Sequence, residues 1–152
     1  MLSLEAWLYL ERFFGPHSFD LMSLDSNCQK NNNGNPLPHY TPWATPGSAG
    51  INLFANPLPA GRNIYVFPPF VLLGPLLRYV VDQDFHGAFT LIVPNILPRP
   101  FWWATLQAFS VDRLLLGKKG SSLVLLFPSQ HSQEWLLRYL QWDLWTFRCV
   151  CL

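Results

Sequence analysis

This sequence contains few charged residues. Among 152 residues, 10 are Lys or Arg and 9 are Asp or Glu, so 12% of the chain is charged and the formal net charge is +1. A nearly neutral chain has no electrostatic attraction of its own for nucleic acid, and a basic partner domain would have to supply it. Half of the residues are hydrophobic, which is ample material for a buried core and excludes a disordered chain.

The sequence also has no pattern typical of disulfide frameworks, metal sites or membrane-spanning helices. The three cysteines are an odd number without zinc-site spacing, and the four histidines are scattered, so we expect free thiols and no metal site. The longest apolar run, residues 66–77, contains three prolines and is shorter than the roughly 20 residues of a membrane-spanning helix. Residues 1–14 carry acidic side chains and form a poor signal peptide. We therefore expect an intracellular protein of the cytoplasm or nucleus, without membrane contact.

Fourteen prolines favour strand ends and loops over a helical bundle. Apolar runs typical of buried strands alternate with helical patterns, and residues 29–61 have the composition of a long irregular loop. This alternation predicts an α/β fold: one domain over 1–152, a Rossmann-like layer structure with a mostly parallel sheet flanked by helices. The expected strands are 17–24, 63–67, 87–94, 121–128 and the C-terminal segment, and the expected helices are 4–14, 72–81, 102–109 and 132–140.

Polar or proline-rich residues follow three of the expected strands. They are Asp20, the pair Pro68-Pro69, and Pro94-Asn95. Ligands of parallel α/β sheets bind beyond the carboxyl ends of the strands. We therefore expect Asp20 and Pro68 to line one crevice. No GxGxxG pattern follows any strand, so no dinucleotide fingerprint supports this site independently.

Four stretches carry a resemblance to a known family. In chain order they are "FDLMSLDSN", "SAGINLFANPL", "YVFPPFVLLGPLL" and "FTLIVPNILPRPFWW". Together they resemble a module that follows the reverse transcriptase and RNase H in DIRS-type tyrosine-recombinase retroelements. That module in turn resembles the phage-type DNA adenine-N6 methyltransferases. The resemblance covers roughly residues 15–110, and the remainder to about residue 150 looks like the retroelement version. It implies S-adenosylmethionine as cofactor, and DNA or a reverse transcriptase–RNase H module as partner.

The catalytic motif of such enzymes has an altered counterpart here. In amino-methyltransferases an Asp or Asn precedes Pro-Pro, and its oxygen accepts a hydrogen bond from the target amino group while the following aromatic ring stacks on the flipped base. The resemblance assigns this catalytic role to Pro68, Pro69 and Phe70. Phe67 occupies the acceptor position and offers no oxygen, so we expect degenerate catalysis. The simpler interpretation is a strand terminator flanked by two core phenylalanines.

The resemblance also assigns three residues to the cofactor: Asp20, Asn27 and Asn52. Asp20 stands where the family has an acidic residue at the end of its first strand, and Asn27 matches an asparagine slightly further on. Asn52 falls where the phage enzymes carry an Asp, so it keeps the shape and loses the charge. A loop-facing or capping carboxylate would explain Asp20 equally, and a turn residue would explain Asn27.

Three hypotheses for function follow. The first is a retroelement-derived domain that resembles S-adenosylmethionine-dependent DNA adenine-N6 methyltransferases and binds the cofactor, with adenine modification either retained or, as Phe67 and Asn52 indicate, degenerate. The second is a non-catalytic structural or docking module of a reverse transcriptase–RNase H polyprotein, and the third is an unrelated doubly wound binding domain. We also expect the chain to be a fragment of a formerly longer reading frame, with an exposed apolar face that promotes association. The sequence leaves the oligomeric state open.

Overall fold

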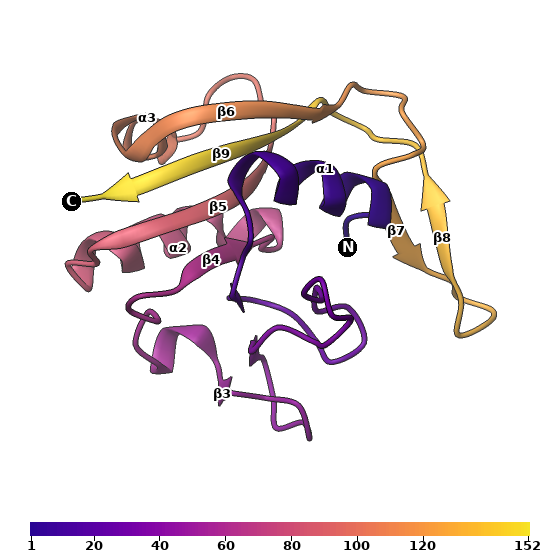
Figure 1. Cartoon of the computed structure of the whole chain (residues 1–152). Coiled ribbons are helices and arrows are strands. Elements are labelled where there is room, and N and C mark those ends of the chain that lie inside the picture. Colours follow the sequence, from indigo (N-terminus) through magenta and orange to yellow (C-terminus); the bar gives the residue numbers. More distant parts are fainter.

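A five-stranded mixed sheet forms the centre of the computed structural model, which describes residues 1–152 (Figure 1). The helices and strands, in chain order, are α1 (Leu4–Phe14), β1 (Phe19–Asp20), β2 (Tyr40–Thr41), β3 (Gly50–Ile51), β4 (Asn63–Val66), α2 (Leu73–Asp82), β5 (Gly87–Pro94), α3 (Trp103–Phe109), β6 (Ser110–Gly117), β7 (Leu125–Pro128), β8 (Trp135–Arg138) and β9 (Leu144–Cys151). Two 3₁₀ turns, Leu53–Ala55 and Phe70–Leu72, precede β4 and α2.

The predicted mostly parallel, Rossmann-like sheet is wrong. The strand order is β1-β4-β5-β9-β6, and only the β1–β4 and β4–β5 pairs are parallel. Strand β9 runs antiparallel to both of its neighbours, β5 and β6. A parallel neighbour needs a long crossover, which is usually helical. The chain has no helix after α3, so β9 returns between β5 and β6 in the antiparallel sense.

The missing fourth helix explains this difference. The helix expected over 132–140 is instead part of a hairpin, in which β8 pairs antiparallel with β7. A short apolar run such as "WLLRYL" fits a strand and a helix equally well by periodicity. Strand β6 was not expected at all. The helices expected over 4–14, 72–81 and 102–109 are confirmed within one residue at each end by α1, α2 and α3.

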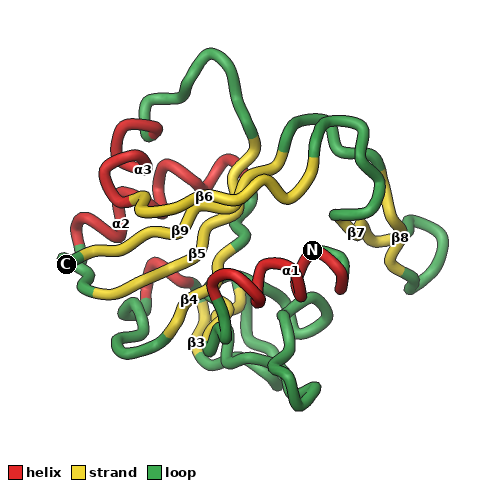
Figure 2. Tube along the Cα trace, turned by 45° about the horizontal axis from the view of Figure 1, so that its top comes forward, coloured by secondary structure: helices red, strands yellow, loops and turns green.

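The sheet carries a separate core on each face. Alternate residues of a strand point to opposite faces, and Leu91 and Ile92 of β5 accordingly belong to different cores. Helices α2 and α3 cover one face, whereas α1 covers the other with Trp7 and Leu10 (Figures 1 and 2). Ser3 caps α1, since its Oγ accepts a hydrogen bond from the Ala6 amide over 3.2 Å.

Two peripheral pieces complete the molecule and frame the site. Residues 29–61 are largely irregular, as expected, apart from the short parallel pair β2–β3 and one 3₁₀ turn. The β7–β8 hairpin projects on the right in Figure 1, away from the C-terminus. None of the helices has the length and apolar character to cross a membrane.

Candidate functional site

A cavity of about 920 Å³ opens where β1 and β4 end. All seven residues singled out by the sequence resemblance line it: Asp20, Asn27, Asn52, Phe67, Pro68, Pro69 and Phe70. The expected crevice shared by Asp20 and Pro68 is therefore present. Parallel pairing of β1 with β4 explains it, since both strands deliver their carboxyl ends to the same edge of the sheet.

Asp20 is the polar centre of this cavity. Its residue is 1% exposed, and its Oδ2 accepts a hydrogen bond from the Gln29 amide over 3.1 Å. The second oxygen, Oδ1, is buried without any hydrogen-bond partner. Burial raises the pKa of Asp20 to about 7, against the opposing effects of the Gln29 amide, the nearby His39, the Ser23 hydroxyl and the Met22 amide. A buried carboxyl oxygen without a partner, on a cavity wall, is typical of a ligand-binding position.

An aromatic wall lies at the end of β4. The rings of Phe67 and Phe70 are stacked at a centroid distance of 6.4 Å, and Trp142 meets Phe70 edge-on at 5.3 Å. Pro68 and Pro69 do end the strand, as the simpler interpretation had it, and the 3₁₀ turn begins directly after them. Phe67 and Phe70 are only partly buried and line the cavity, so they are more than core residues.

The two asparagines use their side-chain oxygens locally. Asn27 Oδ1 accepts a hydrogen bond from the Leu24 amide over 2.7 Å, which is the turn role expected as the simpler explanation. Asn52 has a φ of 61° and caps the following 3₁₀ turn by accepting a bond from the Phe54 amide. Asparagine tolerates this left-handed conformation better than most residues. Both residues shape the wall, and their amide groups face no protein acceptor.

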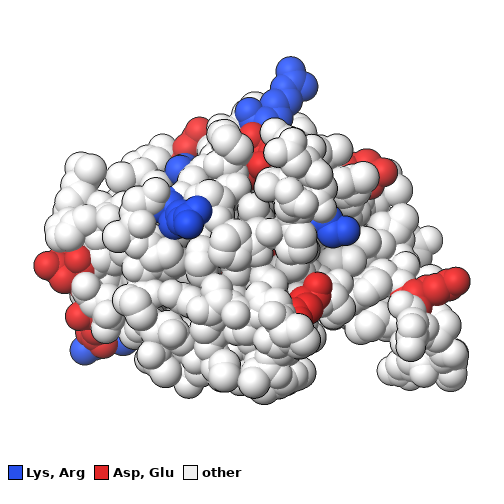
Figure 3. All heavy atoms as spheres, turned by 60° about the horizontal axis from the view of Figure 1, so that its bottom comes forward, with Lys and Arg blue, Asp and Glu red and all other residues white.

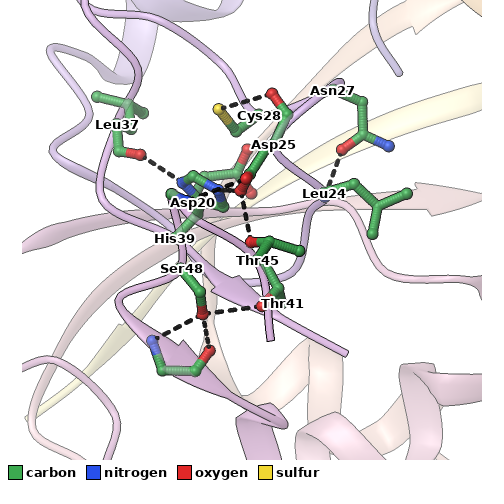
Figure 4. Close-up of polar contacts among 12 residues, drawn as sticks. Asp20, Leu24, Asp25, Asn27, Cys28, Leu37, His39, Thr41, Thr45 and Ser48 are labelled. Carbon is green, nitrogen blue, oxygen red and sulfur yellow. Dashed lines mark hydrogen bonds and ion pairs between the residues drawn. The ribbon is translucent and has the colours of Figure 1, made fainter. Parts of the chain in front are cut away.

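A contact between the buried His39 and the exposed Asp25 lies beside the cavity (Figure 4). His39 Nδ1 lies 2.8 Å from the Leu37 carbonyl, and Nε2 lies 2.7 Å from Asp25 Oδ1. The Leu37 carbonyl and the Asp25 carboxylate thus hold the His39 ring from both sides. Asp25 also accepts hydrogen bonds from Thr45 Oγ1 and the Gly47 amide. The bond from His39 is the main reason that the pKa of Asp25 is lowered.

Replacing Asp25 by Ala is expected to loosen the turn at residues 45–47. The Gly47 amide loses its acceptor, and the turn is no longer tied to the segment beside Asp20. Losing one such bond should speed local hydrogen exchange roughly fivefold or more. Mass-spectrometric exchange over residues 41–50 measures this, with Asp82→Ala as the control because Asp82 pairs only with Arg78 on α2. Equal exchange rates in the two variants would contradict this role of Asp25.

The hairpin wall of the cavity was missed by the sequence analysis. Phe127, Arg138, Tyr139 and Trp142 line the cavity from β7, β8 and the segment that follows β8. Their only sequence signal is the density of aromatic residues after position 127, and the expected helix over 132–140 concealed it. Of these residues, Arg138 adds a positive charge to the wall of a cavity that Asp20 also lines.

The cysteines and the potential metal ligands do not assemble into a second site. No cluster of three potential metal ligands is present, and Cys28, Cys149 and Cys151 are all free and buried. Burial raises the pKa of Cys149 to about 12, which makes its thiol unreactive. On the face drawn in Figure 3, basic and acidic side chains are scattered over a mostly uncharged surface.

No protein-family model matches the chain, and no curated protein matches it.

Proposed function

We propose that this chain is a retroelement-derived domain that binds S-adenosylmethionine in the cavity at Asp20 and has lost efficient methyl transfer. The observation that carries the proposal is Asp20, which has a buried carboxyl oxygen without a partner and lines the same cavity as the Phe67–Phe70 segment. These groups come from segments some fifty positions apart, and the resemblance to adenine-N6 methyltransferases assigns both of them to one ligand site.

The chemistry of the cavity suits this ligand. Small-molecule sites are mostly apolar, with a few polar groups, and occupy roughly 300–1,000 Å³. The cavity falls within that range, and 18 of its 28 lining residues are hydrophobic. A sulfonium cation is stabilised by aromatic faces and by a carboxylate. Phe67, Phe70 and Asp20 provide both kinds of group.

Loss of transfer follows from Phe67. A methyltransferase needs an acceptor oxygen at this position to raise the electron density of the attacking amino nitrogen. Phe67 places a ring there, stacked against Phe70. Removing an interaction made mainly in the transition state costs about 10²–10³ in rate. We therefore expect no methylation of DNA above background, whatever its sequence.

Calorimetry with S-adenosylmethionine tests the binding step. We expect saturable binding by the native protein, and roughly tenfold or greater weakening in Asp20→Ala, because the ligand loses a charge-assisted hydrogen bond. Phe70→Ala should also weaken binding, whereas Phe101→Ala is the matched control, since Phe101 is 89% exposed and does not line the cavity. Absence of binding by the folded protein would overturn the proposal and favour the docking-module hypothesis.

Transfer of labelled methyl groups to DNA tests the second step. We expect no incorporation. Incorporation that Phe70→Ala abolishes would show an active enzyme and contradict the degenerate motif. Equal incorporation by the native protein and by Phe70→Ala would point to a contaminating activity. The two proteins must therefore be purified and assayed in the same way.

A further inference from the structure

The outer face of α1 is apolar and uncovered. Helix α1 buries Ala6, Trp7 and Leu10 against the sheet. Its opposite side exposes four large hydrophobic residues, which are Leu4 (65%), Leu8 (52%), Tyr9 (42%) and Phe13 (53%). Figures 1 and 2 both show the helix in front of the sheet with no other segment over it. Contiguous exposed apolar patches on soluble proteins typically mark an interaction surface.

The spacing of these residues forms two rows. Leu4 and Leu8 are separated by four residues, as are Tyr9 and Phe13, and residues four apart lie above one another on a helix. Glu5 and Arg12 lie between the two rows. Both are exposed, and neither makes an ion pair or a side-chain hydrogen bond within the molecule. Two opposite charges are thus held on an apolar face without partners.

The charge pattern is complementary to itself in one orientation only. Residues 5 and 12 are equally far from a point between Leu8 and Tyr9, next to the midpoint of α1 at Tyr9. When two copies of the helix lie antiparallel about a two-fold axis at that point, Glu5 of each copy meets Arg12 of the other. A parallel pair would place like charges together, which is destabilising. The antiparallel arrangement also opposes the two helix dipoles favourably.

We propose that two copies of this chain associate through α1 in this antiparallel, two-fold arrangement. Leu8 and Tyr9 lie at the axis, and the two Glu5–Arg12 pairs flank it. Such an interface is isologous, because the same patch serves both subunits. The proposal is independent of the ligand cavity, which opens at the carboxyl ends of β1 and β4.

The expected association is weak. A helix of 11 residues is about 16 Å long. It therefore buries less than the roughly 800 Å² per partner of a standard interface. We expect a dissociation constant in the micromolar range, roughly 10 μM or above, and a dimer fraction that rises with protein concentration.

Charge reversal with rescue is the decisive experiment. Sedimentation velocity from about 1 to 500 μM should show a monomer–dimer equilibrium for the native chain. Glu5→Arg and Arg12→Glu should each weaken dimerisation roughly tenfold or more, since each creates two like-charge contacts. The double variant E5R/R12E should recover native affinity, because it exchanges the partners. Leu8→Glu should abolish the dimer by placing two carboxylates at the axis.

Glu134→Arg is the matched control. Glu134 is exposed in the segment between β7 and β8 and is absent from α1, so its reversal should leave dimerisation unchanged. None of the variants touches the buried side of α1, and circular dichroism verifies that each is folded. A monomer at every concentration, or a double variant that remains monomeric, would overturn the proposal. Partition of the native chain, but not of Leu8→Glu, onto neutral lipid vesicles in place of dimerisation would assign the face to a membrane surface and overturn it equally.

Discussion

Asp20→Asn is expected to stabilise the protein at pH 8 and to leave its stability close to that of the native chain at pH 4. The pKa of Asp20 is about 7 in the folded state, against an ordinary value of 3.8, because the carboxyl is buried. A carboxyl with a raised folded pKa binds more protons folded than unfolded, so its contribution to stability falls as the pH rises from about 4 to about 7. Above pH 7 the full penalty applies.

The size of the effect follows from the shift. About three pKa units at 1.4 kcal/mol per unit correspond to roughly 4 kcal/mol as an upper value. In the native protein the Gln29 amide donates a hydrogen bond to Asp20 Oδ2. Asparagine retains an oxygen for this amide and carries no charge into the cavity. Urea unfolding at pH 4, 6 and 8 should therefore show a growing difference in midpoint between the variant and the native protein.

Asp25→Asn is the internal control, with the opposite sign. Hydrogen bonds from His39, Gly47 and Thr45 lower the pKa of Asp25, so its ionised form stabilises the fold and the variant should be less stable at pH 8. If Asp20→Asn were instead destabilising at pH 8, the carboxylate would have to be held by favourable contacts. The interpretation of Asp20 as an unpaired, ligand-directed group would then be wrong. A residue that costs stability and lines a cavity is the pattern expected of a binding site.

The position of the site was predictable from the sequence because it depends on local features. A Pro-Pro pair ends a strand because neither residue can donate a ladder hydrogen bond, and the carboxyl ends of adjacent parallel strands share one edge. The prediction for Asp20 and Pro68 required only that β1 and β4 be parallel neighbours, and they are. The error in the rest of the sheet did not affect it.

The composition of the remaining wall was not predictable for a physical reason. Residues 132–140 have apolar side chains at spacings that suit either a helix or a strand, and only pairing with β7 decides between them. The direction of β9 depends on the same choice, because a parallel return usually uses a helical crossover and no helix lies between β6 and β9. The lack of a hydrogen-bond partner for Asp20 Oδ1 is likewise a property of the packed structure, because it depends on which donor groups the fold places near that oxygen.

Phe147→Ala is expected to destabilise the protein by about 3–5 kcal/mol, the cost of removing a large buried aromatic side chain. Phe147 is 1% exposed, and Trp103 of α3 meets its ring edge-on at 5.6 Å. It lies on β9 between Leu91 of β5 and Arg113 of β6. Its side chain is therefore enclosed by two strands and a helix, and the resulting cavity cannot collapse easily. Chemical denaturation measures the loss.

Phe101→Ala separates this effect from the general loss of an aromatic residue, since Phe101 is 89% exposed and its removal should change stability by less than about 0.5 kcal/mol. A loss near 4 kcal/mol at Phe147 requires neighbours on both sides of β9, because a residue on an edge strand packs against one strand only. A loss of 1 kcal/mol or less would mean that β9 lies at an edge, and the antiparallel insertion between β5 and β6 would be wrong. The experiment thus tests the feature of the sheet that the sequence did not predict.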